Sequence, residues 1–200
     1  ICCGYKGYLI NRYFKKLSYQ VIKKTNKTQT YLLKKNNWVV QCVNTGIKSN
    51  TGGRLLKLKK ILEKEENFFL TYGDGVSNVN LKNLLKYHLV NKKIGTVTAV
   101  KPPARFGVLK ISKKKVISEF KEKFDNNDIW INGGFFVFTK NIFKFTKKIT
   151  DSLEENVISN LVNKKSLIAY MHNDFWHPMD TMRDKIKLNQ LLKDNRAPWI

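Results

Sequence analysis

The sequence predicts a single α/β domain, in which helices cover both faces of a mostly parallel β-sheet. Three observations lead to this fold class. Short β-rich or apolar runs alternate with segments whose apolar residues recur at helical spacing. The chain has 200 residues, of which 42% are hydrophobic, enough for one sizeable core. No repeat and no linker-like stretch divides it, so we expect one domain over residues 1–200.

The first half of the chain supplies this alternation. Helices are predicted where apolar residues recur at helical spacing, over 10–17, where they fall at i, i+3, i+4 and i+7, and over 55–62 and 81–89. Strands are predicted for apolar or β-rich runs that are too short for a helix, over 38–43, 68–72 and 94–100. The segment 19–37 shows no readable pattern. Alternation of strand and helix is typical of parallel sheets.

The second half changes pattern. A hairpin is predicted from 108–111 and 116–120, followed by strands over 131–138 and 167–171. Two adjacent glycines in INGGFFVF indicate close approach of a ligand or of another backbone segment. A capping box is predicted from Ser152 with Glu155, and Thr181 with Asp184 is predicted to cap the last clear helix.

The composition is strongly basic, with a net charge of +23 from 38 Lys plus Arg against 15 Asp plus Glu. Such a balance is typical of nucleic-acid-binding proteins. The lysines, however, are scattered through every segment, and no zinc-finger or RNP-like motif accompanies them. We therefore interpret them as a solvated surface and keep nucleic-acid binding as the alternative.

No apolar run reaches the length of a membrane span, and no export signal opens the chain. The cysteines Cys2, Cys3 and Cys42 lack metal-ligand spacing, so we expect reduced structural thiols in a cytoplasmic protein. Further side chains are interpreted as structural rather than as ligands: His88, His172, Phe175, Trp176 and His177.

Gly73-Asp74-Gly75 ends a predicted central strand. Ligands of α/β folds bind at the carboxyl ends of strands, and glycine lets them approach the backbone. Asp74 is therefore a candidate ligand of Mg²⁺, which favours one or two carboxylates plus substrate phosphates. A plain Asp-Gly turn explains the same residues.

Two further stretches place functional groups at strand ends. Ser49-Asn50-Thr51-Gly52-Gly53-Arg54 precedes a predicted helix, where free N–H groups and Arg54 suit an anion or a nucleobase edge. The alternative is an ordinary capped helix. Asp180 follows the strand over 167–171 and gives, with Asp74, the two carboxylates that a phosphate-bound Mg²⁺ needs. The alternative for Asp180 is a helix N-cap.

Several motifs stand in order along the chain: NTG followed by TGGRL, TYGDG, PPARFGVL, FKEK, INGGFFV, FWHPMDTMRDK and the closing APW. Together they resemble the glucose-1-phosphate cytidylyltransferases, a family of bacterial sugar nucleotidyltransferases, from Ile1 to the C-terminus. GDG alone is a weak signal, whereas INGGFFV with the W-x-P-M-D-T-x-R-D-K run is far more specific. The resemblance implies a Rossmann-like sheet of the nucleotide-diphospho-sugar transferase type.

The resemblance also implies a function. The family joins CTP and glucose 1-phosphate to give CDP-glucose and pyrophosphate, for deoxysugars of surface polysaccharides. Asp74 and Asp180 match the family's catalytic Mg²⁺ ligands. Positions that contact the nucleotide are matched by Ser49, Arg54 and Gly73. Positions that hold the sugar phosphate are matched by Gly107, Glu122, Lys123, Asn132 and Gly133. Family members tend to form higher oligomers.

The chain departs from the family at its start. The family opens with a first strand, a glycine-rich loop carrying G-T-R and a K-P-K-P segment, and neither motif occurs in these 200 residues. We therefore expect an N-terminally truncated chain that cannot grip the triphosphate and has little or no activity alone. A smaller departure is Phe124, where the family usually has proline. Because base-reading residues lie partly in the absent segment, a transferase that uses dTTP or UTP is the alternative.

Overall fold

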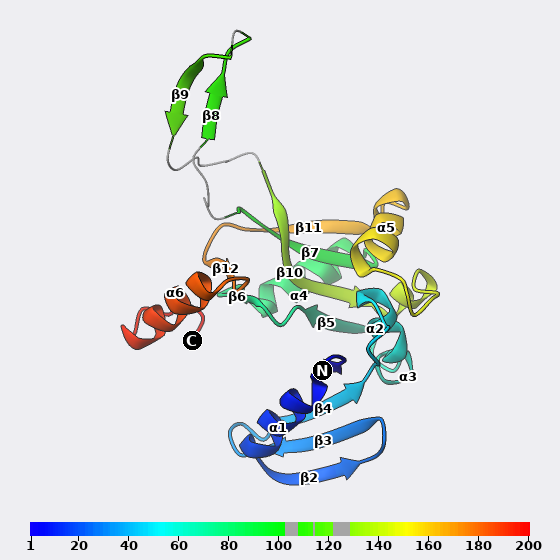
Figure 1. Cartoon of the computed structure of the whole chain (residues 1–200). Coiled ribbons are helices and arrows are strands. Elements are labelled where there is room, and N and C mark those ends of the chain that lie inside the picture. Colours follow the sequence, from blue (N-terminus) through cyan, green and yellow to red (C-terminus); the bar gives the residue numbers. More distant parts are fainter. Residues whose placement is uncertain (103–107, 114, 122–128) are drawn as a thin grey trace. The chain divides into compact units, whose positions relative to one another are not determined.

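The structure, a computed structural model, describes residues 1–102, 108–113, 115–121 and 129–200. The chain divides into two compact units, residues 1–68 with 139–166 and residues 69–138 with 167–200. Figure 1 shows the helices and strands of both units. The single domain expected from the sequence stays a prediction.

The first unit contains a four-stranded sheet in the order β1–β4–β3–β2. Its strands are β1 (Cys2–Cys3), β2 (Ser18–Lys24), β3 (Thr28–Leu33) and β4 (Val39–Asn44). β1 pairs parallel with β4, whereas β2, β3 and β4 form an antiparallel meander. The segment 19–37, which shows no readable pattern in the sequence, thus contains most of a hairpin. Its turn is closed by the Thr25 hydroxyl, which accepts the backbone N–H groups of Lys27 and Thr28.

Helix α1 (Gly7–Leu17) packs on this sheet at the predicted position. Ile10 and Phe14, one turn apart on the helix, are the partly buried side chains that contact the sheet. The core beneath them is formed by Cys3, Tyr31, Leu33 and Cys42. Tyr13 and Leu17, which share the predicted apolar spacing with them, are 60% and 40% exposed, so the spacing read from the sequence is correct for only half of the predicted face.

Burial of the thiols leads to a prediction about their reactivity. All three cysteines are free, as expected, and Cys3 and Cys42 are buried. The pKa of Cys42 is raised to about 11, mainly by burial and next by the neighbouring Cys3. Since only the thiolate is nucleophilic, Cys42 should react with a disulfide reagent at pH 7.5 at least about a hundredfold more slowly than a free thiol. The measurement uses a Cys2→Ser, Cys3→Ser variant, whose remaining thiol is Cys42. The rate of chromophore release from Ellman's reagent is compared for the native and the unfolded protein. Equal rates in the two states would contradict the prediction.

The rest of the first unit is helical. It contains α2 (Thr51–Lys57), α3 (Lys59–Leu62), the 3₁₀ helix η1 (Lys140–Lys144), the π-helix η2 (Leu153–Ile158) and α5 (Ser159–Asn163). The helix predicted over 55–62 is therefore two short pieces, divided at Leu58. The Ser152 hydroxyl accepts the Glu155 N–H at 3.2 Å, as predicted. In a full capping box the Glu155 side chain would also accept the Ser152 N–H. Here that N–H donates to Asn156 Oδ1 at 2.7 Å instead, so only one half of the predicted capping box is correct.

The second unit is built around a sheet in the order β11–β7–β10–β5. Its strands are β5 (Asn67–Thr71), β7 (Gly95–Val100), β10 (Ile131–Thr139) and β11 (Leu167–His172). Two helices, α4 (Leu81–Asn91) and α6 (Met182–Lys193), belong to this unit. It also holds a ribbon of β6 (Gly75–Ser77) with β12 (Trp176–Pro178), and the predicted hairpin of β8 (Val108–Ile111) with β9 (Ile117–Lys121).

The α/β class is confirmed, but the sheets are mixed rather than mostly parallel. Parallel pairing joins β1 to β4 and β7 to β11, whereas β10 runs antiparallel to β7. The reason lies in the connections. Parallel neighbours need a long crossover such as a helix, and β2, β3 and β4 follow one another through short turns instead.

The core of the second unit contains a buried histidine. The His88 side chain, on α4, is 1% exposed, and its Nδ1 lies 2.8 Å from the Thr96 hydroxyl on β7. Burial lowers the pKa of His88, which favours the neutral ring. The structural role expected for His88 is confirmed.

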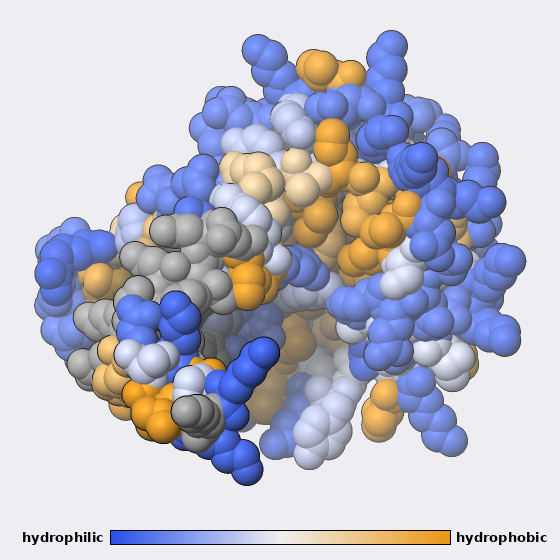
Figure 2. Space-filling model, turned by 90° about the horizontal axis from the view of Figure 1, so that it is seen from above, coloured by the Kyte–Doolittle hydropathy of each residue, from blue (hydrophilic) through white to orange (hydrophobic). Residues whose placement is uncertain are grey.

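The surface agrees with the scattered lysines of the sequence. Hydrophilic side chains are widespread on the face shown in Figure 2, with apolar ones gathered between them. None of the described helices combines the length and the apolar character needed to cross a bilayer.

Candidate active site

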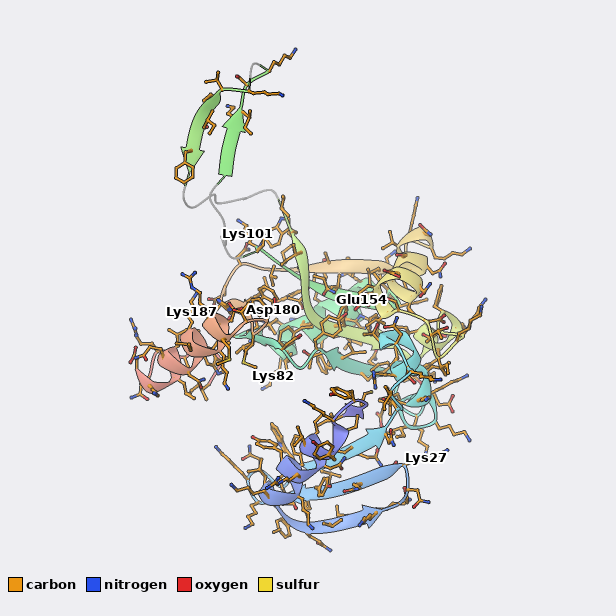
Figure 3. The ribbon with its side chains drawn as sticks, in the orientation of Figure 1. Lys27, Lys82, Lys101, Glu154, Asp180 and Lys187 are labelled. Carbon is orange, nitrogen blue, oxygen red and sulfur yellow. The ribbon has the colours of Figure 1, made fainter. Side chains whose placement is uncertain are left out.

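The ribbon of β6 and β12 brings Asp74 and Asp180 to one place. The two strands run antiparallel, with Gly75 opposite Pro178. Asp74 immediately precedes β6 and Asp180 follows β12 by two residues, so both flank the same end of the ribbon. The Met179 N–H donates to the Asp74 carbonyl oxygen at 2.7 Å, which extends the pairing beyond the strands. Both aspartates are exposed, and Figure 3 shows Asp180 where the chain enters α6.

Asp180 does not cap the helix that follows it. The N-cap of α6 is Thr181, whose hydroxyl accepts the Asp184 N–H at 3.2 Å. Asp184 Oδ2 in turn accepts the Thr181 N–H at 3.0 Å. The predicted cap of Thr181 with Asp184 is confirmed and has the form of a capping box, and the N-cap alternative for Asp180 is wrong. The turn alternative for Asp74 holds, because Gly73 and Asp74 form the turn between β5 and β6.

The donor set at this end of the ribbon fits a divalent cation that is shared with phosphates. Two exposed carboxylates offer oxygen ligands from neighbouring backbone segments. Within the described ranges, no group of three or more His, Cys, Asp or Glu side chains is placed to hold a metal ion. Mg²⁺ is commonly bound through one or two carboxylates together with substrate phosphates, so a pair suits a metal that arrives with a nucleotide.

β10 is joined to the ribbon through Trp176. The indole Nε1 donates to the Gly133 carbonyl oxygen at 2.7 Å. Beside it, Asn132 Oδ1 accepts the Gly134 N–H at 2.8 Å. A Cβ on Gly133 would lie 2.8 Å from Val100 Cγ1, so packing within the sheet already requires glycine there. The pair of glycines predicted from INGGFFV thus marks close approach of neighbouring protein atoms.

Gly73 has no such packing role and leads to a prediction. A Cβ at this exposed position would meet nothing within 4 Å. Gly73→Ala should therefore change the free energy of unfolding by less than about 1 kcal/mol. If the nucleotide approaches this backbone, the added methyl group should weaken CTP binding by about tenfold or more, because overlap with a bound ligand is destabilising. Calorimetric titration beside thermal unfolding measures both effects, and unchanged affinity would remove Gly73 from the site.

In the first unit, Ser49 and Arg54 converge on the loop after β4. Arg54 Nη1 donates to Thr45 Oγ1 at 2.6 Å and to the Gly46 carbonyl at 3.2 Å. The buried Ser49 hydroxyl donates to the Thr45 carbonyl at 2.5 Å, and Lys57 Nζ donates to the same carbonyl at 2.6 Å. Lys57 is missing from the sequence prediction, although its spacing of three from Arg54 puts both cations on one helix face.

The glycines before Arg54 are required by packing. A Cβ on Gly53 would overlap the carbonyl oxygen of Ile149. The Gly53 N–H donates to the Asp151 carbonyl at 3.0 Å, and the Asn50 side chain accepts the Thr51 N–H at 2.8 Å. The prediction that this helix start offers its N–H groups to an anion is therefore wrong for these two groups. The alternative, an ordinary capped helix, is confirmed.

The other predicted residues divide into two sets. Two histidines are buried and hydrogen-bonded, as expected: His172 contacts the Ser77 hydroxyl at 3.2 Å, and His177 contacts the Pro178 carbonyl at 2.7 Å. Outside the described residues lie the remaining sugar-phosphate candidates and the departure next to them, namely Gly107, Glu122, Lys123 and Phe124.

Comparisons with known proteins agree on one family. A family model described as "Nucleotidyl transferase" matches residues 8–195. The glucose-1-phosphate cytidylyltransferase of Salmonella typhi is 37% identical over 204 residues, which cover 100% of this chain and 79% of that protein. The probable glucose-1-phosphate cytidylyltransferase of Bacillus subtilis (strain 168) is 32% identical, covering 98% of this chain and 78% of that protein.

Solved structures resemble the fold. HddC from Yersinia pseudotuberculosis matches with a TM-score of 0.60 at 17% identity, over 96% of this chain and 76% of that chain. The same protein complexed with GMP-PN matches with a TM-score of 0.63 at 15% identity, over 94% and 76%. At such identities the likeness shows the fold.

Proposed function

Because the chain belongs to the nucleotidyl transferase family, with glucose-1-phosphate cytidylyltransferases among its relatives, we propose that it uses CTP and glucose 1-phosphate to make CDP-glucose and pyrophosphate. The observation that carries this proposal is the 37% identity across the whole chain to a relative of that name. A role in deoxysugar synthesis for surface polysaccharides, a cytoplasmic location and homo-oligomers are proposed on the resemblance of the motifs.

The proposed reaction is a displacement at phosphorus. A phosphate oxygen of glucose 1-phosphate bonds to the α-phosphorus of CTP, and the bond from that phosphorus to the α–β bridging oxygen breaks. Pyrophosphate carries away the electron pair of that bond. The protein's part is to position the reactants and to neutralise charge. Asp74 and Asp180 would hold Mg²⁺ at their end of the ribbon, and the bound metal would neutralise phosphate oxygens.

Both sets of binding residues are part of the proposal. Ser49, Arg54 and Gly73 are proposed to contact the nucleotide, and Arg54 presents a planar cation that is held by Thr45. The sugar phosphate is proposed to meet Gly107, Glu122, Lys123, Asn132 and Gly133.

The first test is nucleotide binding. These 200 residues are expected not to hold the triphosphate for turnover, but they retain Ser49, Arg54 and Gly73. Calorimetric titration with Mg²⁺ should therefore still show weak binding of CTP, at least about tenfold tighter than that of UTP or dTTP, because the wrong base leaves polar groups of the site unpaired. A preference for UTP or dTTP would point to a different sugar nucleotidyltransferase. Absence of binding to all three would overturn the proposal. The expected lack of turnover by these 200 residues stays a prediction, and family-like release of pyrophosphate would contradict it.

The net charge of +23 favours a second candidate, nucleic-acid binding. That candidate predicts affinity for DNA or RNA that falls with salt and survives Asp74→Ala and Asp180→Ala. Fluorescence anisotropy of a labelled oligonucleotide at two salt concentrations distinguishes it from Mg²⁺-dependent nucleotide binding.

A further inference from the structure

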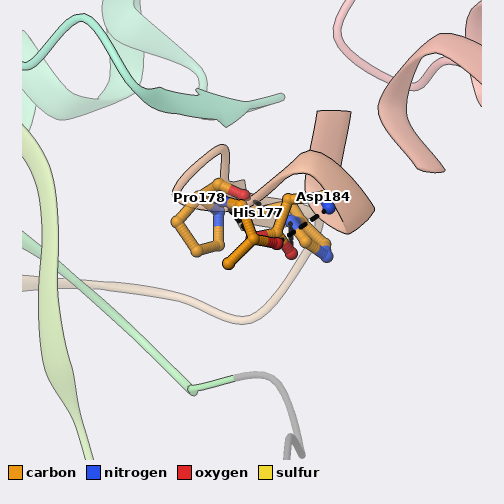
Figure 4. Close-up of polar contacts among 4 residues, drawn as sticks. His177, Pro178 and Asp184 are labelled. Carbon is orange, nitrogen blue, oxygen red and sulfur yellow. Dashed lines mark hydrogen bonds and ion pairs between the residues drawn. The ribbon is translucent and has the colours of Figure 1, made fainter. Parts of the chain in front are cut away.

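The backbone that carries Asp180 is a short link, residues 179–181, between β12 and α6. On the ribbon side, the Met179 N–H is bonded to the Asp74 carbonyl. Next to the link are two buried polar residues, His177 and Asp184, whose side chains are 7% and 12% exposed. Figure 4 shows these two side chains together. Neither has a part in the proposed chemistry.

Asp184 contacts the chain on both sides of Asp180. Its Oδ2 accepts the Thr181 backbone N–H at 3.0 Å and the Thr181 hydroxyl at 2.8 Å. Its Oδ1 lies 3.8 Å from His177 Nδ1. A helix cap needs only the first of these oxygens, so the contact with His177 goes beyond capping.

His177 holds the other end of the link. Its Nδ1 lies 2.7 Å from the Pro178 carbonyl oxygen, and a carbonyl only accepts, so Nδ1 carries the hydrogen. That carbonyl belongs to the peptide bond that leads into Met179. The Asp180 link is thus fixed at three points, by the Asp74 carbonyl, by His177 and, through Thr181, by Asp184.

We propose that His177 and Asp184 are positioning residues, which hold the link so that the Asp180 carboxylate can share a divalent cation with Asp74. The inference rests on the proposed function and adds two residues to it. Metal affinity depends on how firmly the ligands are held, and loss of a supporting group typically weakens binding about 10–100-fold. A link of three residues with an exposed carboxylate would otherwise have to be ordered by the metal itself.

The test compares His177→Asn with His177→Leu. The two replacements have nearly the same shape, but only asparagine keeps an N–H donor at the place of Nδ1. The readout is the binding of Mn²⁺ in the presence of CTP, followed by electron paramagnetic resonance without sugar phosphate, so that no turnover is needed. We expect His177→Leu to weaken Mn²⁺ binding about tenfold or more, and His177→Asn to stay within about threefold of the unsubstituted chain.

A second variant keeps the test decisive if His177→Leu does not fold. In Asp184→Asn a neutral amide oxygen would replace the charged oxygen that accepts from the Thr181 N–H and hydroxyl, and the amide nitrogen would take the place of Oδ1 beside His177, so we again expect about tenfold weaker Mn²⁺ binding. Unchanged Mn²⁺ binding in both variants, with binding lost in Asp180→Asn, would overturn the positioning role alone. Equal weakening in the asparagine and leucine variants of His177 would overturn the role of its hydrogen bond. If the unsubstituted chain binds no Mn²⁺ with CTP, the proposed function fails and this inference fails with it.

Discussion

Asp180→Asn is expected to weaken the binding of Mn²⁺ with CTP by at least about a hundredfold, more than loss of a supporting group would. The substitution keeps the size of the side chain and removes the charge that a hard divalent cation requires. Because Thr181 is the N-cap of α6, the helix start keeps its hydrogen bonds. The thermal midpoint should therefore move by less than about 2 °C. Electron paramagnetic resonance of Mn²⁺ and a thermal scan measure the two quantities.

Asp194→Asn is the matched control for this experiment. Asp194 is exposed and lies beyond the other end of α6, and its replacement by asparagine removes the same charge. It should leave Mn²⁺ binding within about twofold, since exposed charges more than about 10 Å apart are screened by salt. Equal losses in the two variants would show that net charge, rather than a carboxylate ligand at position 180, controls the affinity.

Gly53→Ala is expected to lower the free energy of unfolding by about 2–4 kcal/mol. The added Cβ would overlap the carbonyl oxygen of Ile149, and backbone atoms on both sides cannot move away as a flexible side chain could. The bond from the Gly53 N–H to the Asp151 carbonyl would be disturbed as well. Equilibrium unfolding in urea, followed by circular dichroism, measures the loss.

Gly73→Ala serves as the comparison, because the same methyl group meets no atom within 4 Å there. The two glycines thus separate packing from function. Gly53→Ala should destabilise the fold strongly, and Gly73→Ala should leave it almost unchanged while affecting the nucleotide. Similar stability of the two variants would contradict the close approach of the backbone around Gly53.

The elements that sequence reasoning predicted correctly are those set by local chemistry. Helix α1 formed where its apolar spacing predicts it, although only Ile10 and Phe14 of the predicted face pack against the sheet. The cap of Thr181 with Asp184 formed as expected, since its donors and acceptors lie within four residues. The cap of Ser152 was predicted only in part, because Asn156 competes with Glu155 for the same N–H.

The candidate site shows where such reasoning ends. Asp74 and Asp180 were chosen as separate strand ends, and only the pairing of β6 with β12 brings them to one end of a ribbon. The TGG run is interpreted from the sequence as a place for an anion, but the distant Asp151 carbonyl accepts the Gly53 N–H and the Ile149 carbonyl occupies the space at Gly53. Lys57 gained significance only because Thr45 accepts from it and from Ser49.

The sequence by itself determined the family and the helices and strands that have a clear period, and it supplied the two carboxylates that we propose as metal ligands. These follow from side-chain chemistry over a few neighbouring residues and from the order in which the motifs stand along the chain. Only the tertiary structure decided the mixed sense of the sheets, the packing role of Gly53 and the contact of His177 with Asp184. Some of those features depend on contacts between residues that are far apart in the chain. Others depend on which of several possible partners a polar group bonds to. The local spacing of residues contains no information about either.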